Sequence, residues 1–232
     1  MSALIVTIDG PAGSGKSTAA RLLARRLGLE FLDTGAMYRG LTTHCLDRGI
    51  DPAEQVEAVG KSARTAAMRF DWQADPPRLH VDGGDGFTDV TDRLRDPDVT
   101  ARVSIVAALP PVRDVMVKAQ QKIGREHPRL VTEGRDQGSV VFPDAPVKFF
   151  LDATPGVRAR RRAQQLHRMG KPADEERILN ALLRRDRRDK NRSDGPLICP
   201  EDAIMIDTTD LGLQEVVDLL ERYVREKMPE GA

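Results

Sequence analysis

The sequence predicts an α/β fold, a parallel sheet flanked by helices. Two observations carry this prediction. Short apolar segments with the length of buried strands recur at residues 4–8, 130–132, 147–151 and 203–206, and residues 31–32 form a shorter candidate. Segments with a helical spacing of apolar residues lie between them, and this alternation is typical of a parallel sheet covered on both faces.

The first apolar segment is followed by a glycine-rich octet with the pattern G-x-x-x-x-G-K-[ST]. It consists of Gly10, Pro11, Ala12, Gly13, Ser14, Gly15, Lys16 and Ser17, and a helical pattern follows it. The glycines allow backbone N–H groups to surround phosphate oxygens, and the helix N-terminus adds partial positive charge. We expect Lys16 to reach the β- and γ-phosphates and the Ser17 hydroxyl to ligate Mg²⁺. A glycine-rich turn can also be only a turn, but all fixed positions of the pattern are met in the right context, which favours a nucleoside triphosphate site. The predicted fold is therefore a P-loop NTPase-type parallel sheet flanked by helices.

Three residues are predicted to cap helices. Asp51 and Thr154 each precede a proline, which suits the first helical position, and the helix after Thr154 runs toward Met169. Asp210 is the third predicted cap. The last helix follows it, with an apolar stripe of Leu213, Val216, Val217 and Leu220.

Residues 68–92 interrupt the alternation of strands and helices. Strand-like runs at residues 68–72, 78–81 and 87–90 are separated by turn-forming stretches at 75–77 and 82–86. We therefore predict a small antiparallel β insert rather than a loose surface excursion. Further on, Pro110 and Pro111 break one long helical pattern into two helices, roughly 98–108 and 111–124.

Composition argues against several functional classes. The 232 residues suit one domain with insertions, and a net charge of zero with 4% aromatic residues argues against a nucleic-acid partner. Cys45 and Cys199 have no motif spacing, so we expect reduced thiols rather than a disulfide or metal site. No segment has the length of a membrane span, and the first strand begins too early for a secretory signal. We therefore expect a cytoplasmic protein without a membrane partner, and the lack of an apolar surface stripe favours a monomer.

The rest of the chain favours a kinase among the proteins that carry such a loop. The loop alone does not separate kinases, GTPases and motor-type ATPases. No D-x-x-G switch tetrad of a GTPase occurs, and the glycine spacing does not suit a dinucleotide-binding fold. Thr34, Arg39 and Arg135 follow predicted strands, at the sheet edge where ligands bind. Arginines there suit a phosphorylated acceptor, because two anionic phosphates must approach each other during transfer.

Two arginine-rich helical segments add candidates. Arg185, Asp189 and Arg192 fall on one helix face, where they can hold a phosphate and a sugar hydroxyl. Taken alone, that helix favours a solvated face with an Arg185–Asp189 pair. The second cluster comprises Arg158, Arg160, Arg161, Arg162, Arg168 and Lys171. On a mobile element these side chains can close over the triphosphate, although a surface position is favoured for any single one.

Taken together, the motifs resemble those of the bacterial cytidylate kinase family. The resemblance is carried by IDGPAGSGKST at residues 8–18, DTGAMYR at 33–39, GRDQGSVVFPDA at 134–145 and RDRRDKNR at 185–192, and it runs essentially end to end. It implies transfer of the γ-phosphoryl group of ATP to CMP or dCMP, giving CDP or dCDP and ADP, with Mg²⁺. It also implies one kinase domain with a core at about 1–60, 98–157 and 172–232, an acceptor-region β insert at about 61–97 and a short lid at about 158–171.

The resemblance further implies roles for individual residues, with ATP bound from Gly10 to Thr18. The family positions that hold the acceptor phosphate are matched by Arg39, Arg135 and Arg192, those that read cytosine by Ser104, Arg113 and Asp136, and those that meet the sugar by Arg185 and Asp189. Thr34 stands where the family often has serine, which keeps the hydroxyl and adds a methyl group. Arg158 and Arg162 match lid arginines, which act in catalysis with Lys16 and Arg135.

Cytosine recognition by a carboxylate and a guanidinium also makes chemical sense, because cytosine presents an amino donor beside two acceptors. Without the resemblance, Ser104 would be an ordinary helix-interior serine, and Glu133 either orients Mg²⁺-bound water or is a structural acid. No general base is needed, because the acceptor phosphate is itself the nucleophile. Two alternatives stay open: a P-loop kinase for UMP, AMP or a non-nucleotide metabolite, and a regulatory module that binds ATP without turning it over.

Overall fold

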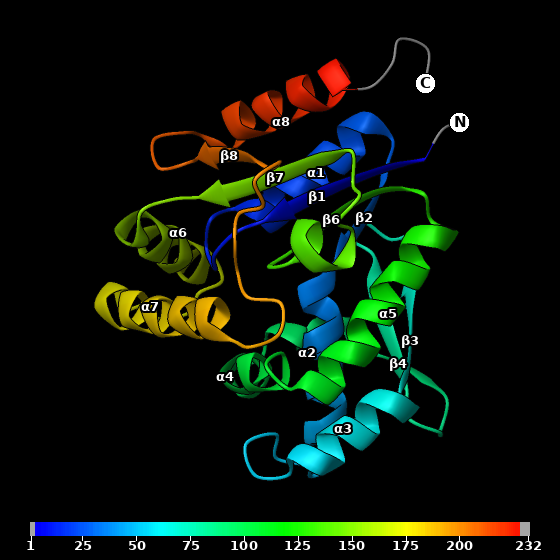
Figure 1. Ribbon diagram of the computed structural model, residues 1–232. Helices are drawn as coiled ribbons and strands as arrows, with labels where there is room; N and C mark the ends of the chain where they lie inside the picture. The colour runs from blue at the N-terminus through cyan, green and yellow to red at the C-terminus, as the bar shows by residue number, and fades with distance from the viewer. Residues whose placement is uncertain (1–2, 228–232) are drawn as a thin grey trace. The chain divides into compact units, whose positions relative to one another are not determined.

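The computed structural model describes residues 3–227 (Figure 1), and these divide into two compact units. Unit 1 comprises residues 3–29 and 128–227, and unit 2 is Glu30–His127. Unit 1 therefore contains the glycine-rich octet and both arginine-rich helical segments, whereas unit 2 contains the predicted β insert.

Unit 1 contains four parallel strands in one sheet, in the order β6-β1-β7-β8. They are β1 (Leu4–Asp9), β6 (Arg129–Gly134), β7 (Val147–Asp152) and β8 (Ile204–Asp207). The central strand β1 is almost completely buried and pairs with β6 up to Asp9↔Gly134, so both strands end at the same level. All four strands predicted for this unit are confirmed, with ends shifted by one or two residues.

Helices connect the strands of unit 1. They are α1 (Lys16–Leu27), η2 (Gln137–Val141), α6 (Pro155–Arg168), α7 (Glu175–Asn191) and α8 (Leu213–Lys227), of which η2 is a single π-helical turn. α1 packs against α8, where Arg26 bonds to Asp218 and Glu221, and α6 packs against α7. This α/β arrangement confirms the predicted fold class.

Unit 2 consists of helices and a small antiparallel sheet. Its elements are β2 (Glu30–Asp33), α2 (Thr34–Asp47), α3 (Val56–Thr65), β3 (Ala67–Asp71), β4 (Arg78–Asp82), β5 (Phe87–Asp89), η1 (Thr91–Arg95), α4 (Pro97–Val106) and α5 (Pro110–Glu126). The sheet has the order β3-β4-β5 with antiparallel pairing, which confirms the predicted β insert. The prolines at 110 and 111 do separate two helices, as predicted.

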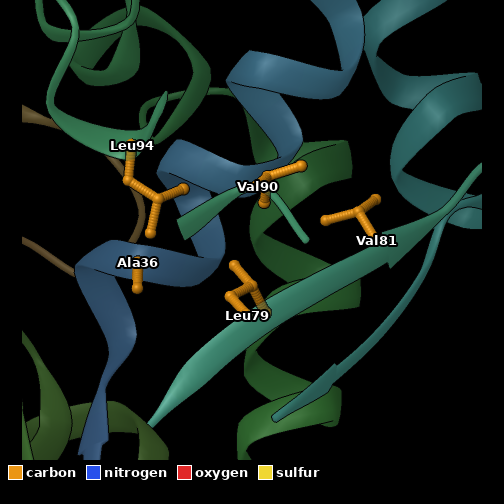
Figure 2. Close-up of a cluster of buried hydrophobic side chains, with 5 residues drawn as sticks. All are labelled: Ala36, Leu79, Val81, Val90 and Leu94. Atoms are coloured by element: carbon orange, nitrogen blue, oxygen red, sulfur yellow. The ribbon is translucent and has the colours of Figure 1, made fainter. Parts of the chain in front are cut away.

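A small apolar core joins the antiparallel sheet to α2 (Figure 2). Leu79 and Val81 are two positions apart on β4, so both side chains lie on the same face of the strand. They form one buried cluster with Ala36, Val90 and Leu94. A glycine in α2 permits the close approach: a Cβ atom at Gly40 would lie 2.5 Å from Leu79 Cδ2. The β insert therefore supports the helix that carries Thr34 and Arg39.

An aromatic contact ties the end of β3 to the end of α5 within unit 2. The rings of Trp72 and His127 lie 4.4 Å apart between centroids. The ring of Phe70 lies 5.2 Å from that of Trp72, tilted against it. The imidazole Nδ1 of His127 lies 2.6 Å from Glu30 Oε2. These contacts join the β insert to both ends of unit 2.

Two of the predicted helix caps are wrong, and local hydrogen bonds explain why. The Asp51 carboxylate accepts the Ala53 N–H (2.9 Å) and so closes a turn, and α3 begins only at Val56. The last helix begins only at Leu213, three residues after Asp210, and Glu215 accepts the Gly212 N–H (2.7 Å) at its start, so Asp210 does not occupy the cap position.

The cap at Thr154 is correct in position, but its side chain makes no capping hydrogen bond. On α8 the predicted stripe is buried at Val216, Val217 and Leu220, whereas Leu213 is exposed. Across residues 3–227, none of the helices combines the length and the apolar character needed to cross a membrane.

Candidate active site

The glycine-rich octet forms a tight loop between β1 and α1. Gly10 and Gly15 have positive φ values of 150° and 90°, which side chains disfavour. A Cβ atom at Gly10 would lie 2.0 Å from the Leu151 carbonyl oxygen, so only glycine fits there. Gly15 directly precedes α1, which leaves the first backbone N–H groups of that helix directed toward the loop.

Three polar side chains meet at this loop. Lys16 is only 5% exposed, and its Nζ donates to the Pro11 carbonyl (3.3 Å) and lies 3.6 Å from Glu133 Oε2. The Ser17 hydroxyl donates to Glu133 Oε1 at 2.6 Å. Glu133 is buried near the end of β6. A hydroxyl and a carboxylate beside an ammonium group suit a Mg²⁺–phosphate group, since Mg²⁺ prefers oxygen ligands.

Arg158 is buried against the loop. Only 4% of it is exposed; its Nη1 donates to the Ala12 carbonyl (2.9 Å) and lies 2.7 Å from Asp186 Oδ2, while its Nε donates to the Ala153 carbonyl (2.9 Å). The surface position that the sequence favoured for any single arginine of this segment is therefore wrong for Arg158. The neighbouring Arg162 donates to Gln165 Oε1 (2.6 Å) on the same helix, and Arg160, Arg168 and Lys171 are exposed.

A second group of charged side chains gathers near the ends of β6 and α7. Arg135 Nε donates to Asp189 Oδ2 (2.8 Å), and Arg185 Nε lies 3.9 Å from the same oxygen. Arg192 Nη2 lies 3.3 Å from Asp136 Oδ2. Arg185 and Asp189 share a face of α7 as predicted, but Arg192 is the first residue beyond the helix, so the helical spacing does not place it.

The charges in this group hold one another ionised. Burial lowers the pKa of Arg135, but the negative charges of Asp189 and Glu133 outweigh it and the net shift is upward. Burial likewise raises the pKa of Asp189, yet the charges of Arg135 and Arg185 hold it below its usual value. The group therefore presents fixed guanidinium charges at neutral pH.

Asp9 is a buried carboxylate that the sequence interpretation missed. It is the last residue of β1 and is 1% exposed. Oδ1 accepts the Gln137 N–H (2.9 Å) and Oδ2 accepts the Gly138 N–H (2.8 Å). Burial raises the pKa of Asp9 to about 7, although both backbone hydrogen bonds oppose the shift. The available signal was an acidic residue closing an apolar strand immediately before Gly10.

Unit 2 carries the four other predicted acceptor residues. Thr34 is the buried first residue of α2, whose start is capped by Asp33 through the Ala36 N–H (3.0 Å). On the same helix, Arg39 Nη1 donates to the Leu94 carbonyl and to Thr100 Oγ1, both at 3.0 Å.

The remaining two residues of this set are buried on neighbouring helices of unit 2. Ser104 lies on α4, and Arg113 on α5 is fully buried, with Nη1 lying 3.5 Å from the Tyr38 hydroxyl. A guanidinium is rarely buried to this extent, because its charge must be compensated by polar or charged groups around it.

Comparison with known proteins assigns the family. The chain matches the family model described as cytidylate kinase over residues 6–226. A cytidylate kinase from Mycolicibacterium paratuberculosis is 43% identical over 226 residues, covering 97% of this chain and 97% of that protein. One from Corynebacterium efficiens is 45% identical over 214 residues, covering 92% of this chain and 91% of that protein.

Similarity to solved structures is weaker. A gluconokinase from Sinorhizobium meliloti has a TM-score of 0.47 at 15% identity, covering 97% of this chain and 98% of that one. The family model and the curated relatives, in contrast, span nearly the whole sequence and include the phosphate loop and the buried charge group. This chain belongs to the cytidylate kinase family.

Proposed function

We propose that this protein transfers the γ-phosphoryl group of ATP to CMP or dCMP, giving CDP or dCDP and ADP. The observation that carries the proposal is the match to cytidylate kinases over residues 6–226. The geometry of the phosphate loop and of the charged group beside it supports it, because phosphoryl transfer depends on positioning and charge stabilisation rather than on a covalent intermediate.

On the donor side, residues 10–18 bind the triphosphate through backbone N–H groups and Lys16. The ammonium group of Lys16 offsets negative charge on the β- and γ-phosphates. Ser17 and Glu133 are the residues that would hold Mg²⁺, Ser17 directly and Glu133 directly or through water. When bound, Mg²⁺ neutralises charge on the phosphate oxygens.

On the acceptor side, Arg39, Arg135 and Arg192 bind the phosphate of CMP, and Arg185 and Asp189 bind its sugar. The acceptor phosphate carries the attacking oxygen and needs no base. The contact between Arg135 and Asp189 (2.8 Å) holds the guanidinium before the acceptor arrives, so less conformational freedom is lost on binding.

The base is read by Ser104, Arg113 and Asp136, with Thr34 in the family's serine position. A carboxylate accepts from the cytosine amino group, and a guanidinium donates to its ring acceptors. Uracil reverses this polarity, and an unmatched buried polar group costs about 1–3 kcal/mol, which predicts selection against UMP of roughly tenfold or more.

We also propose the three-part layout of a core, a β insert at about 61–97 and a lid at about 158–171. Within the lid, Arg158 and Arg162 are proposed to act on the triphosphate, and Arg158 would give up three partners in unit 1 to do so. We further propose that the enzyme acts in the cytoplasm, where its nucleotide substrates circulate, and as a monomer. Light scattering should then give a mass near 25.6 kDa, and a doubled mass would contradict the monomer.

An acceptor panel tests the activity. ADP formation from ATP and Mg²⁺ is measured with CMP, dCMP, UMP, AMP and no acceptor, and again with excess EDTA. We expect CMP or dCMP to be preferred and EDTA to abolish turnover. Preference for UMP or AMP would overturn the acceptor assignment. ATP binding without acceptor-dependent ADP would instead indicate a regulatory module.

A further inference from the structure

Asp9 belongs to two loops at once. Its backbone is continuous with Gly10, the first residue of the phosphate loop, while its carboxylate accepts two N–H groups, from Gln137 (2.9 Å) and Gly138 (2.8 Å). Those two residues begin the π-helical turn η2, immediately after Arg135 and Asp136. The same residue thus ends the strand before the donor loop and caps the turn after the acceptor residues.

The contact depends on a close approach between the strand and the turn. β1 and β6 lie side by side with Asp9 opposite Gly134, so the chain leaving β6 passes the Asp9 side chain. A Cβ atom at Gly138 would lie 2.9 Å from Thr7 Oγ1 and 3.2 Å from Lys148 Cδ. Glycine is therefore required at this position because a side chain would not fit. Its backbone conformation is not the reason, because its φ is not in the positive range.

The turn determines where Asp136 lies. The Asp136 carbonyl accepts the Val140 N–H (2.9 Å), so the residue stands at the cap position directly before the turn, and its carboxylate lies 3.3 Å from Arg192 Nη2. The hydrogen bonds from the next two residues, Gln137 and Gly138, to the Asp9 carboxylate restrict the backbone of Asp136. A carboxylate as deeply buried as that of Asp9 costs folding free energy, and an apolar side chain would cost less at a purely structural position.

We propose that Asp9 is a positioning residue: it latches the turn that carries Arg135 and Asp136 to the strand that carries the phosphate loop, and so sets the acceptor site for CMP. The readout in CMP turnover rests on the proposed function. The latch itself does not, because it can be followed through the amide protons of Gln137 and Gly138.

The first test replaces Asp9 by asparagine, which keeps the shape but offers an N–H to one of the two backbone donors. We expect KM for CMP to rise about tenfold and the CMP-to-UMP ratio of kcat/KM to fall, with KM for ATP changed less than twofold. Hydrogen exchange at Gln137 and Gly138 should become at least about tenfold faster. The matched control is Asp207→Asn at the end of β8, where an exposed carboxylate accepts the Thr209 N–H (2.8 Å) in its own turn.

The second test disturbs the other partner of the latch. Gly138→Ala should raise KM for CMP in the same way, and the double variant should be clearly less than additive, because both changes break one contact. If Asp9→Asn fails to fold, Gly138→Ala still answers the question.

Unchanged exchange at the two amides, or an equal rise in both KM values, would overturn the latch. Wild-type enzyme without CMP-dependent turnover would instead overturn the proposed function, and the exchange measurement would still decide on the latch.

Discussion

At the scale of single residues, the site consists of buried charges that hold one another in place. Lys16 faces Glu133 at 3.6 Å, Arg135 faces Asp189 at 2.8 Å, and Arg192 lies close to Asp136. Removing one member of such a pair leaves its partner buried without compensation. Substitutions that keep the shape of the side chain therefore test function better than truncation does.

Lys16→Met tests the donor side. The variant keeps most of the aliphatic stem but loses the charge that offsets the β- and γ-phosphates, so we expect kcat to fall about 100-fold or more with an unchanged far-ultraviolet circular dichroism spectrum. Lys122→Met is the control, since Lys122 makes only a surface pair with Glu126 on α5. Near-normal turnover by Lys16→Met would show that the loop does not bind the triphosphate as described.

Asp136→Asn tests the base-reading assignment. Its amide offers an N–H that matches the uracil carbonyl, so we expect the ratio of kcat/KM for CMP over UMP to fall about tenfold while KM for ATP stays within twofold. Steady-state kinetics with both acceptors gives this ratio. A ratio equal to that of the wild type would remove Asp136 from the residues that read the base.

At the scale of elements, α6 and α7 are joined to the phosphate loop through one arginine. Arg158 extends from α6 to the Ala12 carbonyl and pairs with Asp186, which lies on α7 between the residues proposed to bind the sugar. The loop also packs tightly there, because a Cβ atom at Gly13 would lie 3.2 Å from Arg158 Cβ. The position of α7 and the shape of the loop are therefore coupled.

Asp186→Asn breaks this link and leaves Arg158 buried without its counter-charge. We expect the free energy of unfolding to fall by about 3 kcal/mol, as measured by urea denaturation. Asp218→Asn, which removes an exposed partner of Arg26 between α1 and α8, should cost much less because solvent screens that pair. Equal losses for the two variants would argue against a special role for the buried pair.

At the scale of the whole molecule, the pH dependence of stability reports on buried ionisable groups. The pKa of Asp9 is raised by burial from 3.8 to about 7. A carboxyl with a raised pKa in the folded protein contributes stability below its unfolded pKa and loses that contribution as pH rises through the folded value. Ionisation of Asp9 therefore works against folding at neutral pH.

Comparison with Asp9→Asn isolates this contribution. Between pH 5 and pH 8, the free energy of unfolding of the wild type should fall by about 2 kcal/mol relative to the variant. Urea denaturation at several pH values gives both curves. The stability curve of Asp207→Asn should run parallel to that of the wild type over this range. Hydrogen bonding to Thr209 lowers the pKa of Asp207 from its usual value of 3.8, so this carboxyl does not change its charge between pH 5 and pH 8. Parallel curves for Asp9→Asn would contradict the raised pKa.

How much the sequence predicted depends on the range of the interactions involved. The strands and the glycine-rich loop were predictable because their signals are local: an apolar run, fixed glycine spacing and a following helical pattern. The caps at Asp51 and Asp210 were not, because local side-chain hydrogen bonds hold the turns before α3 and α8, from Asp51 itself in the first turn and from Glu215 in the second. The burial of Arg158 depends on Asp186, 28 positions further along the chain, and no periodicity reveals such a pair.

The acceptor residues show the same limit. Arg185 and Asp189 were found from helical spacing, and α7 does bring them together. Arg192 lies beyond the helix and reaches Asp136 only through the tertiary fold. Ser104 and Arg113 were predicted only from the resemblance to a family, because a serine and an arginine within helices carry no signal of their own.

The contact between the rings of Trp72 and His127 has a spectroscopic consequence. Trp72 is the only tryptophan in the sequence and lies in unit 2, beside the ring of His127 at 4.4 Å. Tryptophan fluorescence therefore reports on unit 2, whereas circular dichroism averages over both units. A denaturation series recorded with the two signals shows directly whether the units melt in one cooperative step or in two, without any label being introduced.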